Sequence, residues 1–150
     1  MPTPQHAFHI HWLKPGDDLA DAYQIRTKVF IEEQHVPVEL EIDDIDAITD
    51  HIVVYKDGSP VATGRIVWDE PVSLGRIAVL AEQRGTGLGA VVVTHLLEKV
   101  FSRGYKNVHI HAQTHARGFY ERLGFTAYGE EYDDAGIPHI SMVKHNPAYL

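Results

Sequence analysis

The 150-residue chain contains no cysteine, two methionines and two tryptophans, and it has no long hydrophobic run. Without cysteine there is no disulfide framework, no thiolate metal ligand and no cysteine nucleophile. No apolar stretch approaches the ~20 residues that a membrane-spanning helix needs. Basic residues are also scarce: 13 Lys and Arg stand against 21 Asp and Glu, and a net charge of −8 argues against nucleic-acid binding. The sequence therefore predicts neither a membrane nor a nucleic acid as partner.

The N-terminal stretch, Met-Pro-Thr-Pro-Gln-His, lacks a basic segment followed by an apolar core. We therefore expect no secretory signal and a cytoplasmic location. A chain of this length is expected to form a single domain over residues 1–150 and to bury roughly 70% of the surface that its unfolded form exposes.

A glycine-rich turn is the most informative motif. Its residues, 84–90, read Arg-Gly-Thr-Gly-Leu-Gly-Ala and lie between a strand predicted over 74–80 and a helix predicted over 88–103. Glycines let a ligand approach the backbone closely, and the N–H groups of the first helical turn then point at it. Those N–H groups and the helix dipole favour an anion, and Arg84 adds a positive charge. This turn, which we call the cradle, is predicted to bind phosphate.

Glycine spacing separates the kinds of phosphate site. A P-loop needs Gly-Lys-Ser/Thr, and no such lysine follows the cradle. A dinucleotide-binding fingerprint has the spacing Gly-x-Gly-x-x-Gly and an acid about 20 residues later. Here the third glycine comes one residue early, and the strand predicted at 107–111 offers no acid. A tight turn without any ligand is the other interpretation, and the flanking strand, helix and arginine disfavour it.

The pattern Arg-x-x-Gly-x-Gly-Ala resembles the pyrophosphate loop of the GNAT superfamily of acyl-CoA N-acyltransferases. Residues 111–125 are similar to a second signature of that superfamily, in which an Asn often precedes a helix ending in Phe-Tyr-Glu-x-x-Gly-Phe; here Gln113 stands at the Asn position. Three further stretches resemble the ElaA-like branch of small GNAT proteins: 26–34, Glu41-x-Asp43 and 136–142. The resemblance covers nearly the whole chain.

Hydrophobic periodicity and turn signals predict the order β, helical region, three strands, α, β, α, β, β. The predicted elements are a strand at 8–12, a helix from a cap at Asp17 or Asp18 to about Phe30, strands at 51–55 and 61–68 joined at 56–59, a helix at 114–123 and two strands around 133–136. This order predicts an α/β (α+β) fold with a mixed sheet of six or seven strands and helices on both faces. It is also the order of the GNAT fold, in which two central strands, here around Val79 and Val108, splay apart.

The resemblance implies that acetyl-CoA is the co-substrate and that its acyl group passes directly to an amine in a ternary complex. The absence of cysteine and of a serine nucleophile elbow agrees with direct transfer. Pantetheine would lie between the splayed strands, and the Val79 N–H would polarise the thioester carbonyl. The cofactor-binding residues implied are Ile77, Ala78, Val79, Arg84, Gly85, Thr86, Gly87, Leu88, Gly89, Ala90, Gln113 and Tyr120.

Tyr120 is the proton donor that the resemblance implies, because in the family this tyrosine faces the departing sulfur. A phenol pKa of about 10 suits a thiol pKa of ~8.5. A protonated amine must also lose a proton before it attacks, and Glu33 and His139 are the candidate bases. Phe30, Glu33, Gln34 and His139 are expected at the acceptor site. The alternatives are a packed core tyrosine, a solvated acid and a structural histidine.

The stretch between Lys28 and Lys56 contains no other Lys or Arg and carries eight acids: Glu32, Glu33, Glu39, Glu41, Asp43, Asp44, Asp46 and Asp50. By the implied fold it borders the acceptor site. An uncompensated negative field there would attract cationic amines such as a polyamine, an aminoglycoside-like compound or a lysine side chain. A solubilising acidic loop is the alternative.

The eleven histidines raise the question of a metal. His9 and His11, like His109 and His111, alternate along predicted strands, but no His-Glu-x-x-His pattern or cysteine partner accompanies them, and we expect no metal. A non-catalytic acyl-CoA-binding or protein-interaction module on the same fold is the alternative function, and a tyrosine at position 120 favours catalysis. The sequence leaves open the acceptor, the acyl chain and the oligomeric state, a homodimer included.

Overall fold

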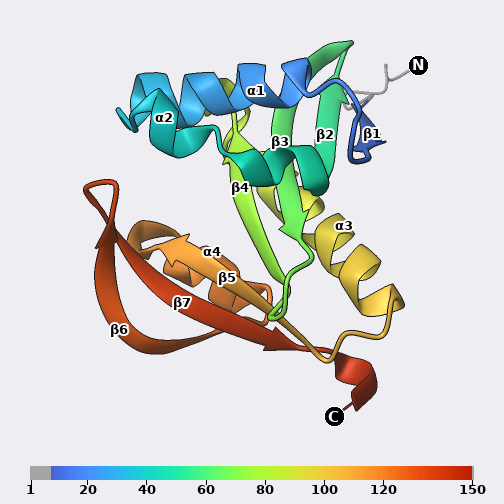
Figure 1. The fold of residues 1–150 in the computed structure, drawn as a ribbon, viewed down its shortest axis with the longest axis vertical. Helices are drawn as coiled ribbons and strands as arrows, with labels where there is room; N and C mark the ends of the chain where they lie inside the picture. The colour runs from blue at the N-terminus through green and yellow to red at the C-terminus, as the bar shows by residue number, and fades with distance from the viewer. Residues whose placement is uncertain (1–7, 150) are drawn as a thin grey trace.

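The computed structural model describes residues 8–149 and contains a seven-stranded sheet with helices on both faces (Figure 1). The sheet order is β1-β2-β3-β4-β5-β7-β6, and all neighbouring strands are antiparallel except β4 and β5. The mixed sheet expected from the sequence is therefore confirmed. The strands are β1 (Phe8–Leu13), β2 (Asp50–Lys56), β3 (Ser59–Val67), β4 (Ser73–Val79), β5 (Asn107–Gln113), β6 (Thr126–Asp134) and β7 (Ile137–His145).

The helical elements are α1 (Ala20–Arg26), η1 (Thr27–Glu33), α2 (Val38–Glu41), η2 (Asp44–Ile48), η3 (Ala81–Gln83), α3 (Leu88–Ser102), η4 (Thr114–Ala116), α4 (Arg117–Arg122) and η5 (Pro147–Tyr149). In the part of the chain that the structure covers, no helix has the length and apolar character needed to cross a membrane.

The first helix differs from the prediction at both ends. The helix begins at Ala20 with Leu19 at its N-cap position, so neither Asp17 nor Asp18 is the N-cap, although Asp18 accepts a hydrogen bond from the Ala20 N–H at 2.9 Å. The helix does not end near Phe30, however, but continues to Glu33 in the wider π form of η1. Hydrophobic spacing at 3.6 residues per turn cannot reveal such a change of winding, which is frequent at functional sites.

Two layers of helix cover opposite faces of the sheet, as alternate residues of β3 show. A Cβ added to Gly64 would lie 2.9 Å from Leu96 and 3.0 Å from Val92, so α3 packs closely on this face. The next residue, Arg65, points to the other face and binds Asp43 and Asp46 beside η2. The α1–α2 layer and the α3 layer thus lie on opposite faces (Figure 1).

The two central strands diverge, as the fold predicts. β4 and β5 pair only at Ser73–His109 and Leu74–Ile110, and the Cα pairing then ends. The splay therefore begins after Ile110, and Val108 precedes the paired residues rather than lying at the gap as expected. Opposite the gap, β4 also departs from regular pairing with β3, and Arg76 there has a positive φ of 49°. This irregularity turns the β4 backbone at the point where the strands separate.

Candidate active site

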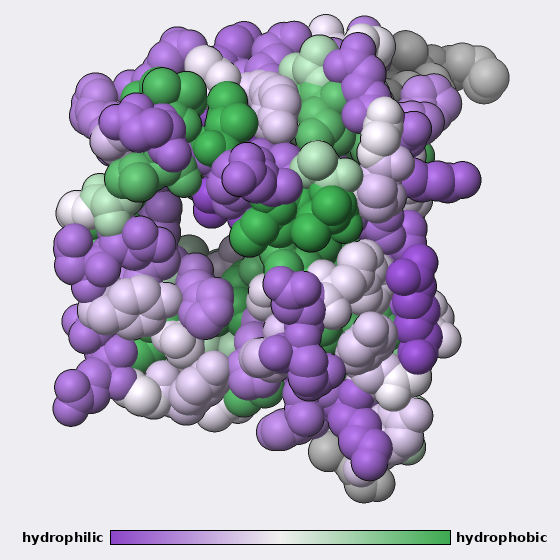
Figure 2. All heavy atoms as spheres, in the orientation of Figure 1, coloured by the Kyte–Doolittle hydropathy of each residue, from purple (hydrophilic) through white to green (hydrophobic). Residues whose placement is uncertain are grey.

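A cleft of about 810 Å³ passes through the splay between β4 and β5. On one side it is lined by the cradle, α3 and α4, and on the other by η1, α2 and the turn between β6 and β7. Figure 2 shows the molecule hollowed between the α1–α2 layer and the β6–β7 part of the sheet. We call the side with the cradle the cofactor half and the side with η1 and α2 the acceptor half.

The cradle forms the end of the cofactor half. Gly87 caps α3 with a left-handed φ of 88°, and Gly85 has a φ of 78°. A Cβ built at either glycine meets no atom within 4 Å, so the space over the turn is open to a ligand. Leu88, Gly89 and Ala90 line the cleft as well. Thr86 does not line it, because its hydroxyl turns back and donates to the Gln83 carbonyl.

The backbone of Val79 faces the gap. The Leu80 N–H donates to Val61 on β3 at 2.9 Å. Because successive backbone groups of a strand point to opposite edges, the Val79 N–H and C=O point away from β3. The carbonyl accepts a hydrogen bond from Arg84 Nε at 3.1 Å, which agrees with this direction. The Val79 N–H is thus placed where a thioester carbonyl in the gap could accept its hydrogen bond.

Arg84 is held by Glu33 rather than pointing freely over the cradle. Both terminal nitrogens of its guanidinium lie 2.9 Å from the two carboxylate oxygens of Glu33. The pair joins the end of η1 to the cradle across the cleft. A carboxylate in this position occupies the donors that a pyrophosphate would use.

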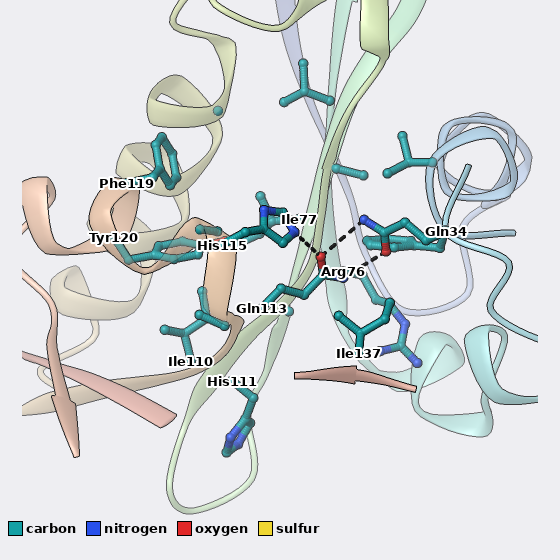
Figure 3. A pocket seen from close by; sticks show the side chains of 18 of the residues that line it. Gln34, Arg76, Ile77, Ile110, His111, Gln113, His115, Phe119, Tyr120 and Ile137 are labelled. Atoms are coloured by element: carbon teal, nitrogen blue, oxygen red, sulfur yellow. Dashed lines mark hydrogen bonds between the residues drawn. The ribbon is translucent and has the colours of Figure 1, made fainter. Parts of the chain in front are cut away.

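Tyr120 is almost fully buried on α4 and still lines the cleft. Its ring packs edge-on against Phe119 and Phe125, with centroids 5.0 and 5.8 Å away. Burial raises the pKa of Tyr120 above its ordinary value, so its hydroxyl is harder to deprotonate than that of an exposed tyrosine. Figure 3 shows Tyr120 and Phe119 on one side of the cleft, with Gln113 at its centre and Gln34 and Arg76 on the other side.

Gln113 connects the two halves of the cleft. Its Nε2 donates to Gln34 Oε1 at 2.8 Å, and Gln34 Nε2 donates back at 3.2 Å (Figure 3). His115 Nε2 lies 2.6 Å from Gln113 Oε1, which accepts from both neighbours. The longer side chain of glutamine, compared with asparagine, gives it this reach from the end of β5 to the end of η1. Sequence reasoning identified both glutamines but not their contact.

His139 lies in the acceptor half, on the face of β7 that is shared with His111 of β5. Its Nδ1 lies 2.7 Å from the Ile137 carbonyl, so Nδ1 carries the hydrogen and Nε2 of the neutral ring is left as an acceptor. The ring stacks on Tyr132 at 5.8 Å. Burial, helped by the neighbouring His109 and His139, lowers the pKa of His111. Across the described residues, no group of three or more potential metal ligands is found.

The acidic stretch is not uncompensated, which corrects the expectation of a broad negative field. Three of its acids bind three arginines from outside the stretch, in what we call the arginine cluster: Arg26, Arg65, Arg76, Glu41, Asp43 and Asp46. Of the remaining acids, Glu33 binds Arg84, and Asp50 lies within 4 Å of Lys99 and Arg103. The partners come from distant parts of the sequence, so a count of charges within the stretch could not reveal them.

Arg26 is the centre of the cluster and is 1% exposed. Its Nε donates to Glu41 at 2.7 Å and its Nη1 to Asp46 at 2.8 Å. Burial alone would raise the pKa of Asp46, but the hydrogen bonds and charges of Arg26 and Arg65 outweigh it and lower the pKa to about 2. The cluster therefore fixes α2 and η2 to the sheet and forms one wall of the acceptor half.

Comparison with known proteins agrees with this geometry. Residues 17–146 match the model of the acetyltransferase (GNAT) domain family. Two Bacillus subtilis proteins are similar over most of their lengths: the uncharacterized protein YyaT (40% identity; 85% of this chain and 88% of the relative) and the uncharacterized N-acetyltransferase YjcF (39%; 87% and 95%).

Escherichia coli ElaA is 35% identical over 81% of this chain and 83% of its own length. Its crystal structure superimposes with a TM-score of 0.83, covering 92% of this chain and 99% of that one. The chain therefore belongs to the GNAT acetyltransferase family and resembles its ElaA members. Its class of activity is acyl-CoA-dependent N-acyl transfer.

Proposed function

We propose that this protein moves an acetyl group from acetyl-CoA to a primary amine by direct attack within a ternary complex. The observation that carries the proposal is the continuous cleft, which joins the cradle to the histidine-bearing acceptor half through the splayed strands. Two substrates that enter from opposite faces of the sheet would meet at the gap, and such positioning is itself a large part of catalysis.

In this proposal the cradle holds the pyrophosphate of CoA. The N–H groups at the start of α3 and the helix dipole favour an anion, and Arg84 adds its charge once it leaves Glu33. Pantetheine lies along β4 beside Ile77, Ala78 and Val79, which line the cleft. The acceptor amine meets Phe30, Gln34 and His139 on the other side.

The chemistry divides between two groups of the cofactor half. The Val79 N–H stabilises the oxyanion that forms when the amine attacks the thioester carbonyl. Tyr120 then gives its proton to the sulfur of CoA as the C–S bond breaks. Its position beside the cleft supports this role, and the hydroxyl is protonated as a general acid must be, but burial raises its pKa and so weakens it as an acid.

His139 is the better supported of the two candidate bases. Its Nε2 is an acceptor, and its ring is held by Ile137 and Tyr132 in the acceptor half. Glu33 pairs with Arg84 and does not line the cleft, although acyl-CoA binding could release it. The cytoplasmic location and a homodimer stay predictions.

The experiment that tests this function is the Tyr120→Phe substitution, assayed by CoA release with acetyl-CoA and a panel of amines. Loss of the hydroxyl should lower turnover roughly 10²-fold and leave acetyl-CoA affinity nearly unchanged, because the ring packing remains. Tyr105→Phe, which removes a hydroxyl beside Trp68, is the matched control. Equal turnover of Tyr120→Phe and the parent protein would exclude Tyr120 as the acid. A protein that binds acetyl-CoA but acetylates no amine would support the binding-module alternative.

A further inference from the structure

The charges that face the acceptor half nearly cancel. Two carboxylates line it, Glu41 and Asp134. Glu41 is fully engaged, because its oxygens lie 2.7 Å from Arg26 Nε and 2.7 Å from Arg76 Nε. Asp134, the last residue of β6, is solvent-exposed where it lines the cleft and has no ion-pair partner among residues 8–149. The site thus offers one unpaired carboxylate, which suits one ammonium group.

The other acids of the stretch do not supply a second anionic contact. Glu32, Glu39 and Asp44 are exposed, and none of them lines the cleft. They lie in bulk solvent, where salt at physiological strength screens a charge over about 8 Å. A second cation on the acceptor would therefore find no carboxylate within the cleft.

The walls of the acceptor half are largely apolar. Phe30, Val36, Leu40 and Ile137 line it, together with Val29 at the back. Leu40 is 55% exposed on α2, so it contributes an open hydrophobic surface rather than core packing. Figure 2 shows hydrophobic side chains gathered over α2. Such walls gain free energy by covering an alkyl or aryl group and lose it by desolvating a charge.

We propose that the acceptor is a monoamine with an apolar body, alkyl or aryl, rather than a polyamine or another polycation. The inference rests on the proposed function, since it names the substrate class of the same cleft. Asp134 attracts the single ammonium group, and the apolar body lies against Phe30, Val36 and Leu40. His139 then takes the proton that the amine must lose.

A matched pair of amines tests this: hexylamine against 1,6-diaminohexane, which has the same six-carbon chain and carries a second ammonium group at its far end. We expect kcat/KM to favour hexylamine about tenfold or more, and to rise about threefold per methylene from propylamine to hexylamine. Calorimetric binding of both amines to the CoA-loaded protein gives a readout that does not need turnover. Spermidine, a longer polycation, is assayed in the same way and should also be a poorer acceptor than hexylamine.

Two substitutions on α2 test whether the preference between the two amines is set inside the cleft. Leu40→Asp places a carboxylate in the acceptor half and should shift the preference toward 1,6-diaminohexane. Val38→Asp adds the same charge at a position that is 52% exposed and outside the cleft, and it should leave the preference unchanged. An equal shift in both variants would mean that the general field of the surface selects the amine, and it would overturn the inference.

The outcomes separate this inference from the proposed function. Preference for spermidine or 1,6-diaminohexane, in turnover and binding alike, would overturn the inference and leave the N-acetyltransferase function in place. Preferential binding of hexylamine without turnover of any amine would support the inference and contradict catalysis. Absence of binding of both amines would overturn the inference.

Discussion

The two halves of the cleft are built in different ways. The cofactor half consists mainly of backbone: the glycine turn, the first turn of α3 and the exposed edge of β4 beyond Leu74. The acceptor half consists of side chains from segments far apart in the sequence, and the arginine cluster fixes one of its walls. Backbone geometry serves an invariant ligand part such as pyrophosphate, whereas side chains can be exchanged to fit different amines. The comparison implies that substitutions in the cofactor half should impair acetyl-CoA binding, whereas substitutions in the acceptor half should impair folding or the choice of amine.

The largest expected effect is in the cofactor half. Gly87→Glu should abolish measurable acetyl-CoA binding, because it places a like charge against the pyrophosphate, at a cost of several kcal/mol. Calorimetry with acetyl-CoA measures the binding affinity of the variant. Gly16→Glu is the matched control, since Gly16 also has a positive φ of 94° and open space around its Cβ. If Gly87→Glu folds and binds acetyl-CoA like the control, the cradle assignment is wrong.

In the acceptor half, the next effect should be on folding rather than on affinity. Glu41→Gln leaves Arg26 buried without one of its two carboxylate partners and should lower the free energy of unfolding by about 3 kcal/mol. Glu39→Gln, on the same short helix but exposed, should change it by less than about 0.5 kcal/mol. Urea unfolding of both variants gives the comparison. Equal stability of the two would show that the arginine cluster does not hold the wall.

The smallest effect concerns the link between the halves. Glu33→Gln frees Arg84 from its ion pair and should raise acetyl-CoA affinity about two- to fivefold, the range of an exposed pair. Its turnover should stay near that of the parent protein, whereas His139→Gln should lose roughly 10²-fold or more as the base is removed. Collapse of turnover in Glu33→Gln alone would assign the base to Glu33. Weaker acetyl-CoA binding would mean that Glu33 positions Arg84 instead of competing for it.

The sequence predicts the backbone geometry of the cradle and the start of α3 because these signals are local. The positive φ values at Gly85 and Gly87, and the start of α3 at Leu88, follow from residues adjacent in the chain. The hairpin at 56–59 is a similar case, since Asp57 and Gly58 both adopt positive φ, as a type I′ turn requires.

The acceptor half could be predicted only in part because its interactions are non-local. Glu41 and Asp46 are separated from Arg26 by 15 and 20 residues along the chain, and Gln34 from Gln113 by 79. Charge counting along one segment therefore gave a negative field where the folded chain has compensated pairs. The π winding of η1 and the short helices α2 and η2 carry no periodic signal of adequate length.

The central claim is that both substrates occupy one cleft at the same time and that the amine attacks the thioester directly. The most direct test of this claim is to measure initial rates while the concentrations of acetyl-CoA and hexylamine are both varied. The account predicts intersecting lines in the double-reciprocal plot, as a ternary complex requires. Parallel lines, the signature of a covalent acyl-enzyme, would contradict it.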